Sequence, residues 1–431
     1  MKRAALLLGA ASLALAACGP KPIDPKRQIG PNPYLPPIHQ YLLPPMHLAT
    51  KADWNGATPA VPSDLKIQAL ATHLKNPRSV YVLPNGDILV SQPDGPQAPP
   101  PGRPKEWVMN WMEAKTHSST KAPNNILLFR DTNGDGVPEL QSVFIANLRA
   151  PFGVVLVGND LYVADTDAIL RFPYHTGETT ITEPGTKLCD LPAFPIDHHW
   201  TKSLTASPDG TKLYAGVGSN SNITENGLTA EVGRASIWEI DRATGAHREY
   251  ATGLRNPNGL QFEPRTHVLW AVVNERDELG PDLVPDYMTS VKAGAFYGWP
   301  YSYYGQHVDP RVQPQRPDLV AKAIPPDYAL SSHVAPLGLV FYGGTNLPAR
   351  YRGGAFVGEH GSWDRSEFNG YKVVFVPFTN GKPSGMAEDV VTGFLDGETM
   401  HGRPVGLAVD THGGLLIADD VGNTVWRVTA K

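Results

Sequence analysis

The stretch SLTASPDGTKLYAGVG, residues 203–218, decides the fold. Apolar and polar residues alternate on both sides of a Pro-Asp-Gly turn, which predicts two half-buried strands joined as a hairpin. The same pattern of alternating run, tight glycine turn and second run returns at five other places. These are residues 78–92, 152–172, 258–275, 337–361 and 405–428.

Six such units predict one building block that is repeated along the chain. With its insertions each unit spans roughly 50 to 75 residues, a period that is typical of β-propeller blades. We therefore predict an all-β fold, a six-bladed β-propeller over residues 51–431 with long loops over one face. The alternative is another all-β architecture that contains similar hairpins. Residues 277–292 and 301–332 are expected to be long loops over that face, and residues 105–115 a helix inside an insertion.

The composition agrees with many short strands. The 431 residues include 42 glycines and 42 prolines, which favour turns over long helices. The net charge is −5 and no basic patch stands out, which argues against a nucleic acid partner. Of the two cysteines, Cys189 lies inside the predicted domain, where we expect a buried apolar residue without a disulfide partner.

The N-terminus resembles an export signal. A basic pair at residues 2–3 precedes an apolar run, residues 4–17, that is too short to predict a membrane span. The run ends in Leu-Ala-Ala-Cys, which resembles a bacterial lipobox that is cut before Cys18 and lipidated on its sulfur. We expect residues 1–17 to be a lipoprotein signal peptide and residues 18–50 a Pro-rich extended tether.

This address predicts an exported lipoprotein on the periplasmic side. No Asp follows Cys18, so we expect an anchor in the outer membrane and contact with the membrane only through the lipid. The alternative is an ordinary secretory signal in which Cys18 stands by chance. Both alternatives predict export.

Two candidate site segments stand directly before predicted strands. His199 precedes the strand of residues 203–218 and is a candidate general base, because neutral imidazole is the usual base near neutral pH. The alternative is a packing or hydrogen-bonding group beside Trp200. Arg255 and Asn256 precede the next hairpin and suit a ligand rich in carboxylates or carbonyls, since guanidinium donates in pairs. The alternative is a loop arginine that caps backbone carbonyls.

Two stretches concentrate acidic residues. Residues 272–287 combine carboxylates with Gly and Pro, and such an irregular, oxygen-rich loop suits Ca²⁺ better than Zn²⁺; the alternative is a solvated acidic loop. Its carboxylates are Glu275, Asp277, Glu278, Asp282 and Asp286. Residues 131–139, DTNGDGVPE, resemble a shortened calcium loop, and a structural Ca²⁺ and a plain turn both stay open.

Three arginines occupy equivalent places in different repeats, namely Arg255, Arg365 and Arg403. A propeller would bring these places around one axis. A ring of arginines in a net-acidic protein predicts an anionic ligand at the mouth of the central channel. This convergence favours the catalytic interpretation of His199.

An ordered set of motifs carries a family resemblance from about residue 65 to the C-terminus. The set is LRNPNGL, NERDELGPD, AGAFYGWPY, APLGLVFY, EHGSWDRS and HGRPVGL. It resembles the soluble quinoprotein glucose/sorbosone dehydrogenases, with the sorbosone dehydrogenase-like branch closest. The resemblance implies a six-bladed propeller that carries pyrroloquinoline quinone and Ca²⁺ over its channel, oxidises a sugar or polyol, and passes electrons to an external acceptor.

The resemblance also implies roles for single residues. His199 would be the general base, Arg255 and Asn256 the quinone-binding pair, with Arg255 also stabilising charge on the quinone. Four further residues would contact the cofactor: Asn222, Arg365, His401 and Arg403. His401 stands where related enzymes carry an arginine, and Asn222 is one candidate for a glutamine that is absent here.

The calcium site that the resemblance implies lies in the loop of residues 275–282. We expect its ligands among Glu275, Arg276, Asp277 and Asp282, through carboxylates and carbonyls. The alternatives to a sugar dehydrogenase are a calcium-dependent six-bladed lactonase or esterase, and a non-catalytic propeller that binds a cell-envelope partner. A quinone-dependent reduction of a dye by sugar distinguishes the sugar dehydrogenase from the hydrolase and from the non-catalytic propeller.

Overall fold

The computed structural model describes residues 22–41, 45–96, 107, 121–194 and 197–431. The predicted signal peptide, Cys18 and nearly all of the helix expected at residues 105–115 lie outside this part of the chain. The described elements are almost entirely strands, which confirms the all-β prediction. No described helix is long and apolar enough to cross a membrane.

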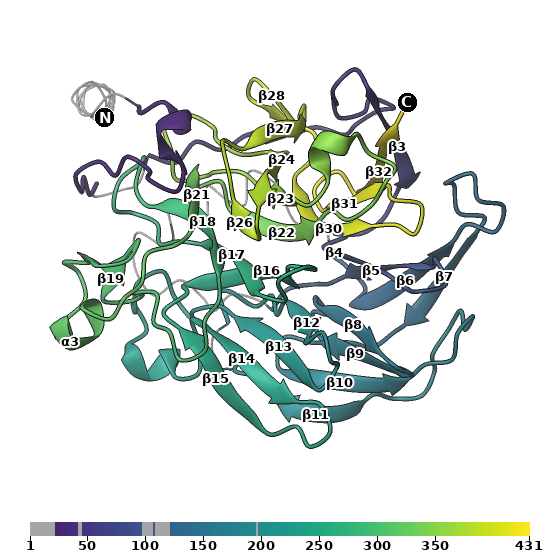
Figure 1. Ribbon diagram of the computed structural model, residues 1–431, viewed down its shortest axis with the longest axis horizontal. Coiled ribbons are helices and arrows are strands. Elements are labelled where there is room, and N and C mark those ends of the chain that lie inside the picture. Colours follow the sequence, from purple (N-terminus) through teal and green to yellow (C-terminus); the bar gives the residue numbers. More distant parts are fainter. Residues whose placement is uncertain (1–21, 42–44, 97–106, 108–120, 195–196) are drawn as a thin grey trace, which may run out of the picture.

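Among the described residues, six antiparallel sheets of four or more strands follow one another along the chain (Figure 1). The first three contain β4 (Ser79–Val82), β5 (Ile88–Gln92), β6 (Asn125–Arg130) and β7 (Leu140–Ile145); β8 (Val154–Val157), β9 (Asp160–Ala164), β10 (Ala168–Pro173) and β11 (Thr186–Asp190); and β12 (Leu204–Ala206), β13 (Lys212–Val217), β14 (Ser236–Asp241) and β15 (His247–Thr252). Each predicted hairpin of this half supplies the first two strands of one sheet.

The other three sheets repeat the arrangement. They contain β16 (Asn256–Phe262), β17 (Leu269–Asn274), β18 (Pro285–Ser290) and β21 (Tyr328–Ser332); β22 (Pro336–Phe341), β23 (Ala355–Glu359), β24 (Lys372–Val376) and β27 (Glu388–Val391); and β30 (Pro404–Val409), β31 (Leu415–Asp419), β32 (Thr424–Ala430) and β3 (Leu65–Ala71). The last sheet therefore joins both ends of the domain, because β3 pairs with β32.

Smaller elements decorate the sheets. The short strands are β1 (Ile29–Gly30), β2 (Thr50–Lys51), β19 (Ser302–Tyr303), β20 (His307–Val308), β25 (Phe378–Thr379), β26 (Lys382–Pro383), β28 (Leu395–Asp396) and β29 (Thr399–Met400). The short helices are η1 (Pro25–Gln28), η2 (Leu228–Glu231), α3 (Pro317–Val320) and η3 (Ala349–Tyr351).

The six sheets are arranged in a ring, and each shares an apolar core with the next. The core between the first two sheets includes Leu128 and Leu161, and the core between the sixth and the first includes Val425 and Val90. Each sheet buries both faces against its two neighbours, so strands such as β5 and β31, which alternation predicted to be half-buried, are buried along their whole length. Glycine shapes the hairpin turns that the sequence predicted: Gly210 has a φ of 69°, which favours a residue without a Cβ.

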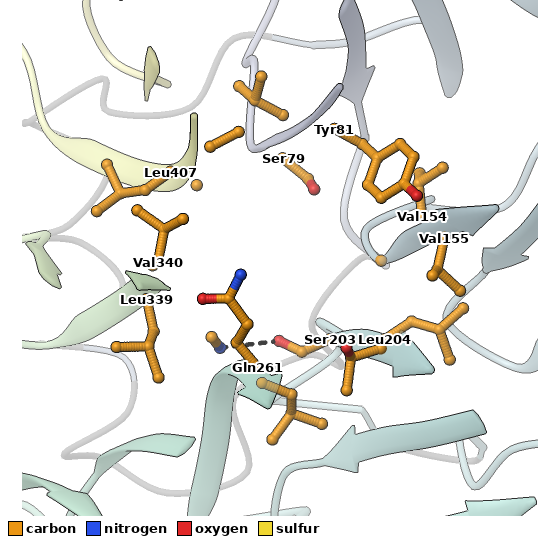
Figure 2. A pocket seen from close by; sticks show the side chains of 18 of the residues that line it. Ser79, Tyr81, Val154, Val155, Ser203, Leu204, Gln261, Leu339, Val340 and Leu407 are labelled. Carbon is orange, nitrogen blue, oxygen red and sulfur yellow. Dashed lines mark hydrogen bonds between the residues drawn. The ribbon is translucent and has the colours of Figure 1, made fainter. Parts of the chain in front are cut away.

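The innermost strands surround a central cavity of about 310 Å³ (Figure 2). These strands are β4, β8, β12, β16, β22 and β30, and they contribute mostly aliphatic side chains with a few polar ones such as Ser203 and Gln261. One end of the cavity is lined by Phe152 and Leu337, which pack with Val405 and, more loosely, Trp200. We call this end the mouth, because the innermost strands begin there.

Two segments that we expected to be loops are part of a sheet. After β16 and β17, strands β18 and β21 are the third and fourth strands of their sheet, so residues 277–292 and 301–332 are only partly loop. The expectation failed because β18, PDYMTS, has only two large apolar residues, Tyr287 and Met288, which are adjacent, so its sequence carries neither alternation nor an apolar run.

The segment expected to be a free tether is packed on the domain over Pro25–Gly30. Strand β1 pairs with β21, and Gln28 is fully buried. The amide of Gln28 donates to the carbonyl of Asp282 at 2.6 Å and accepts from Ser332 at 3.0 Å. This part of residues 18–50 is therefore held by hydrogen bonds and is not an extended spacer. Cys189 is a buried free cysteine, as the sequence predicted.

Candidate functional site

Functional side chains gather at the mouth for a topological reason. In an antiparallel hairpin, the start of the first strand and the end of the second strand lie at the same end of the sheet. His199 lies shortly before β12 and Arg255 directly before β16, while Asp277 follows β17 and Asp420 follows β31. The repeated hairpin therefore delivers residues from distant parts of the sequence to one end of the ring.

His199 is half-buried and its ring has a fixed orientation. Its Nδ1 lies 2.8 Å from the carbonyl oxygen of Ser219, which can only accept, so Nδ1 carries the proton and Nε2 is left as a base. Burial and the neighbouring positive charge of Arg255 hold the pKa of His199 far below its ordinary value. The ring is therefore neutral at neutral pH, as a general base must be.

Arg255 and Asn256 lie beside this histidine. The backbone amide of Ser219 donates to the carbonyl of Arg255 at 2.7 Å, which ties the anchor of His199 to the start of β16. The guanidinium of Arg255 donates to the carbonyl of Glu275 at 2.7 Å and to Oδ2 of Asp277 at 2.8 Å. Much of its donor capacity is thus used within the protein.

Asn256 keeps one polar atom without a partner. Its Nδ2 donates to Asn274 Oδ1 at 3.1 Å, while its own Oδ1 is buried and accepts no hydrogen bond among the described residues. A buried acceptor without a donor is costly unless a ligand or water satisfies it. Asn256 thus keeps an acceptor beside His199 that the described residues leave unsatisfied.

A second cluster continues around the mouth from Trp200. The guanidinium of Arg78 lies 5.6 Å from the Trp200 ring centre and 2.6 Å from a carboxylate oxygen of Asp420. The same carboxylate lies 2.9 Å from Nε2 of His360, whose carbonyl accepts from Arg403 at 2.8 Å. Burial and the charge of Arg403 lower the pKa of His360 to about 4.

Arg403 differs from the other arginines of the mouth. Its guanidinium donates to the carbonyls of His360 and Gly361 and lies 5.2 Å from the Tyr371 ring centre. Within the described ranges, no carboxylate pairs with it. Its guanidinium is therefore not ion-paired, and its positive charge, which also acts on Asp420 nearby, can attract an anionic group of a ligand.

The other predicted cofactor residues have partners of their own. Arg365 is 1% exposed and pairs with Asp282 at 2.8 Å, and His401 packs against the ring of Trp54. Asn222 holds the acidic loop instead, since its Oδ1 accepts from the amide of Asp277 at 2.9 Å. The structure thus gathers His199, Arg255 and Asn256 into one site and turns Arg365 and His401 elsewhere.

The acidic loop is folded inward, and its side chains point in different directions. Burial raises the pKa of Glu275 to about 7, and its carboxylate accepts from the amide of Arg276. The guanidinium of Arg276 lies 3.0 Å from Asp309, and both side chains are 1% exposed. Asp282 faces Arg365, so only Asp277 of the four predicted metal ligands faces other possible ligands.

Those other ligands are His333 and Asp364, which the sequence interpretation missed. Each of Asp277, His333 and Asp364 offers one ligand atom, and the three atoms lie within 4.8 Å of one another. His333 lies shortly before β22, as His199 lies before β12, so the same positional signal was present in the sequence. Although burial lowers the pKa of His333, the carboxylates of Asp277 and Asp364 raise it to about 9.

The second acidic stretch lies on the surface. Asp131, Asp135 and Glu139 form a group of possible metal ligands, and both Asp135 and Glu139 are exposed. Their carboxylates accept hydrogen bonds from the loop itself, for example from the amide of Gly134 to Asp131. Hydrogen bonds within the loop thus support the turn, and a structural Ca²⁺ and a plain turn both stay open.

The comparisons with known proteins confirm the family resemblance. The glucose/sorbosone dehydrogenase family model matches residues 163–363, and the TrAA12-like model matches residues 311–431. An uncharacterized protein of Borreliella burgdorferi is 28% identical over 292 residues, which are 65% of this chain and 76% of that protein.

Two solved structures share the fold. The iodide structure of the Carbohydrate-Active Enzymes Family AA12 protein of Trichoderma reesei has a TM-score of 0.69 and 19% identity, over 86% of this chain and 98% of that chain. The holo form of the PQQ domain of pyranose dehydrogenase from Coprinopsis cinerea has a TM-score of 0.68 and 19% identity, over 88% and 98%.

Proposed function

We propose that this protein is an oxidoreductase that oxidises a hydroxyl or aldehyde-hydrate group of a sugar or polyol, uses pyrroloquinoline quinone as cofactor and passes electrons to an external acceptor. One observation carries the proposal. His199, a neutral imidazole with Nδ1 fixed on Ser219, lies at the mouth beside Arg255 and an unpartnered Asn256 oxygen. The glucose/sorbosone dehydrogenase match over residues 163–363 supports the substrate class.

The proposal includes the architecture: the ring of six sheets is a six-bladed β-propeller. Shared cores between successive sheets and the pairing of β3 with β32 support a closed ring. The likeness to the PQQ domain of Coprinopsis cinerea pyranose dehydrogenase supports the same reading. In this architecture the mouth is the place where loops of all blades meet a ligand.

The polar groups of the mouth fit the quinone, a flat molecule with three carboxylates. Arg403 offers a positive charge with no paired carboxylate in the described part of the chain, and the buried Nε of Arg78 has no hydrogen-bond partner there. Trp200, Phe152, Leu337 and Val405 form an apolar layer at this end of the cavity, against which a ring can lie. When bound, the quinone supplies the hydride acceptor.

The chain's own residues do the rest of the chemistry. Nε2 of His199 accepts the proton of the substrate hydroxyl, because Nδ1 is held by Ser219 and the low pKa keeps Nε2 free. Arg255 stabilises negative charge that develops beside it. Its ion pair with Asp277 holds the guanidinium in place at 2.8 Å.

Calcium does not fit the predicted loop. Burial raises the pKa of Glu275 to about 7, Arg276 faces Asp309, and Asp282 faces Arg365. Five carbonyls of the loop, those of residues 275, 277, 279, 280 and 282, already accept a hydrogen bond, from Arg255, Asn222, His39, His333 and Gln28, so an ion there would share these oxygens with the protein's own donors. The chemistry proposed for His199 and Arg255 does not require calcium.

The test is a titration of the purified protein with the quinone, followed by dye reduction with a panel of sugars and polyols. We expect saturable quinone binding and sugar-dependent bleaching of the dye. Arg403→Gln should weaken quinone binding about 10- to 100-fold, the cost of one charged hydrogen-bonding group. Arg350→Gln is the matched control, because Arg350 pairs with Asp64 on the surface.

Two outcomes of the titration and the activity assays would contradict the proposal. Hydrolysis of lactones or esters with no effect of the quinone would favour the hydrolase alternative. Absence of both quinone binding and hydrolysis would favour a non-catalytic envelope protein.

We also propose that the protein is exported and carries a lipid on Cys18, which holds it at the outer membrane. The lipobox-like sequence supports this, and residues 18–21 would join the lipid to the packed segment Pro25–Gly30. Labelling of cells with radioactive palmitate tests it: wild type should incorporate label and Cys18→Ser should not. Equal labelling of the two would rule out the anchor.

A further inference from the structure

Asp277, His333 and Asp364 form a compact cluster at the edge of the proposed site. They come from three segments that are distant in sequence, the loops after β17, before β22 and after β23. One ligand atom of each lies within 4.8 Å of the other two, and Oδ1 of Asp277 is 3.4 Å from Nδ1 of His333. His333 is 5% exposed and Asp364 1%.

Each of the three residues has its other polar atom held by a neighbour. Oδ2 of Asp277 accepts from Arg255 at 2.8 Å, and Oδ2 of Asp364 accepts from the amide of Glu278 at 2.8 Å. Nε2 of His333 lies 3.1 Å from the carbonyl oxygen of Gly280, which can only accept. Ligands of metal sites are oriented by such outer contacts, above all a histidine whose second nitrogen donates to a carbonyl.

The remaining oxygen of Asp364 is an independent sign of a ligand. Oδ1 is buried and has no hydrogen-bond partner among the described residues. A buried carboxylate oxygen without a donor is costly, and bound ions are one recurrent reason for such an atom. The atoms of the cluster without such an outer contact are Oδ1 of Asp277, Nδ1 of His333 and Oδ1 of Asp364.

The donor set decides which ion suits the cluster. Ca²⁺ takes six to eight oxygen ligands, whereas imidazole with carboxylates suits borderline ions such as Zn²⁺ and Mn²⁺. Three protein ligands with room for a further one are typical of an open zinc site. We propose that Asp277, His333 and Asp364 bind one divalent transition-metal ion of the Zn²⁺ class in preference to Ca²⁺.

The inference does not depend on the proposed redox function. It assigns an ion to a cluster that shares Asp277 with the predicted calcium loop, residues 275–282, and takes its other two ligands from outside that loop. Metal binding is measured without quinone or sugar, so its failure and the failure of the proposed function are separate results.

The experiment is calorimetric titration of the untagged, EDTA-treated protein with Zn²⁺, Ca²⁺ and Mg²⁺ in separate runs. Asp131→Asn combined with Asp135→Asn serves as the background, so that the surface acidic loop contributes nothing. We expect one Zn²⁺ per chain and at least 100-fold weaker Ca²⁺ and Mg²⁺. Asp364→Asn, which keeps the size of the side chain, should weaken Zn²⁺ binding at least tenfold.

A second measurement locates the ion in the unsubstituted protein and does not depend on the folding of a variant. Anomalous diffraction at the zinc edge should place an ion about 2.0–2.2 Å from atoms of Asp277, His333 and Asp364. Binding of Ca²⁺ as tight as that of Zn²⁺, equal Zn²⁺ binding by Asp364→Asn, or an anomalous peak elsewhere would each overturn the inference.

Discussion

His199 and His333 lie at the same mouth and differ in charge. His199 is anchored through Nδ1 to a carbonyl and lies beside the positive Arg255, so burial and repulsion keep it neutral. His333 lies beside Asp277 and Asp364, and their charges outweigh burial, so its pKa is raised to about 9. Burial favours the neutral ring in both cases, and the sign of the neighbouring charges decides whether that preference is reinforced, as at His199, or overcome, as at His333.

The ion pair between Arg255 and Asp277 stands between the two histidines. Its guanidinium faces the His199 side and its carboxylate the His333 side, at 2.8 Å from each other. One pair thus supplies the repulsion that keeps one ring neutral and part of the attraction that charges the other. The mouth thus has one half in which the imidazole is neutral, beside Arg255, and one in which it is charged, beside Asp277 and Asp364.

The largest effect should follow removal of the neutral ring. His199→Gln should lower turnover of the quinone-loaded protein about 10²- to 10⁴-fold, because a general base is lost, while quinone affinity stays within about threefold. Steady-state dye reduction and a quinone titration measure the two quantities. His198→Gln is the matched control, since its side chain is exposed and it should keep near wild-type turnover. Unchanged turnover in His199→Gln would remove the histidine from the reaction.

A methyl group placed beside His199 should disturb the neutral half alone. A Cβ on Gly218 would clash with the Cβ of His199 and with Oδ1 of Asn256. We expect Gly218→Ala to lower turnover about 10- to 100-fold through misplacement of the base. Gly216→Ala, whose Cβ would meet the carbonyl of Pro257, should destabilise the same strand without this loss. Equal turnover of the two variants would contradict the account.

Loss of the carboxylate between the histidines should change the charged half. In metal-free protein, Asp277→Asn should lower the pKa of His333 below about 7, because burial then outweighs the attraction that remains. Stability should fall by about 2 kcal/mol, since Arg255 loses its partner. NMR titration of the ring and urea unfolding measure these effects. Asp309→Asn should also destabilise, through Arg276, yet leave His333 unchanged.

The smallest effect is a pH dependence of stability with two limbs. The folded pKa of His333 is raised, so its contribution is present below about pH 6.5 and is lost as the pH rises towards about 9. The folded pKa of His199 is lowered, so stability is lost instead as the pH falls below about 6.5. In EDTA we expect about 1 kcal/mol for each limb.

Single variants separate the limbs. His333→Gln should flatten the alkaline limb, and His199→Gln should reduce the acid limb, to which the low pKa of His360 also contributes. Urea unfolding between pH 5 and 9 gives both slopes. If both variants changed the pH dependence of the unfolding free energy in the same direction, the two rings would not differ in charge as described.

The sequence predicted the hairpins of the ring because their signal is local. Alternation and turn glycines such as Gly210 are present within each stretch. Strand β18 was missed because its sequence, PDYMTS, has no alternating apolar run. Pro25–Gly30 was expected to be a tether because a proline-rich sequence does not reveal that Gln28 is buried.

The sequence predicted which residues lie near the ends of the inner strands, but not where their side chains point. His199 and Arg255 were found because they precede inner strands, and His333 shares that position but was overlooked. In the segment SWDRS, Arg365 was predicted to be the functional residue and Asp364 was not. In the structure Arg365 pairs with Asp282, and Asp364 lies beside His333. Neighbouring loop residues point to different partners, and those partners are known only once the chain is folded.

The most direct test of the opposed histidines is a long-range ¹H–¹⁵N correlation spectrum of histidine-labelled, metal-free protein at pH 7, assigned with His199→Gln and His333→Gln. We predict one protonated nitrogen, Nδ1, and a free Nε2 for His199, and two protonated nitrogens for His333. A doubly protonated His199, or two rings that titrate together near pH 6.5, would contradict the account.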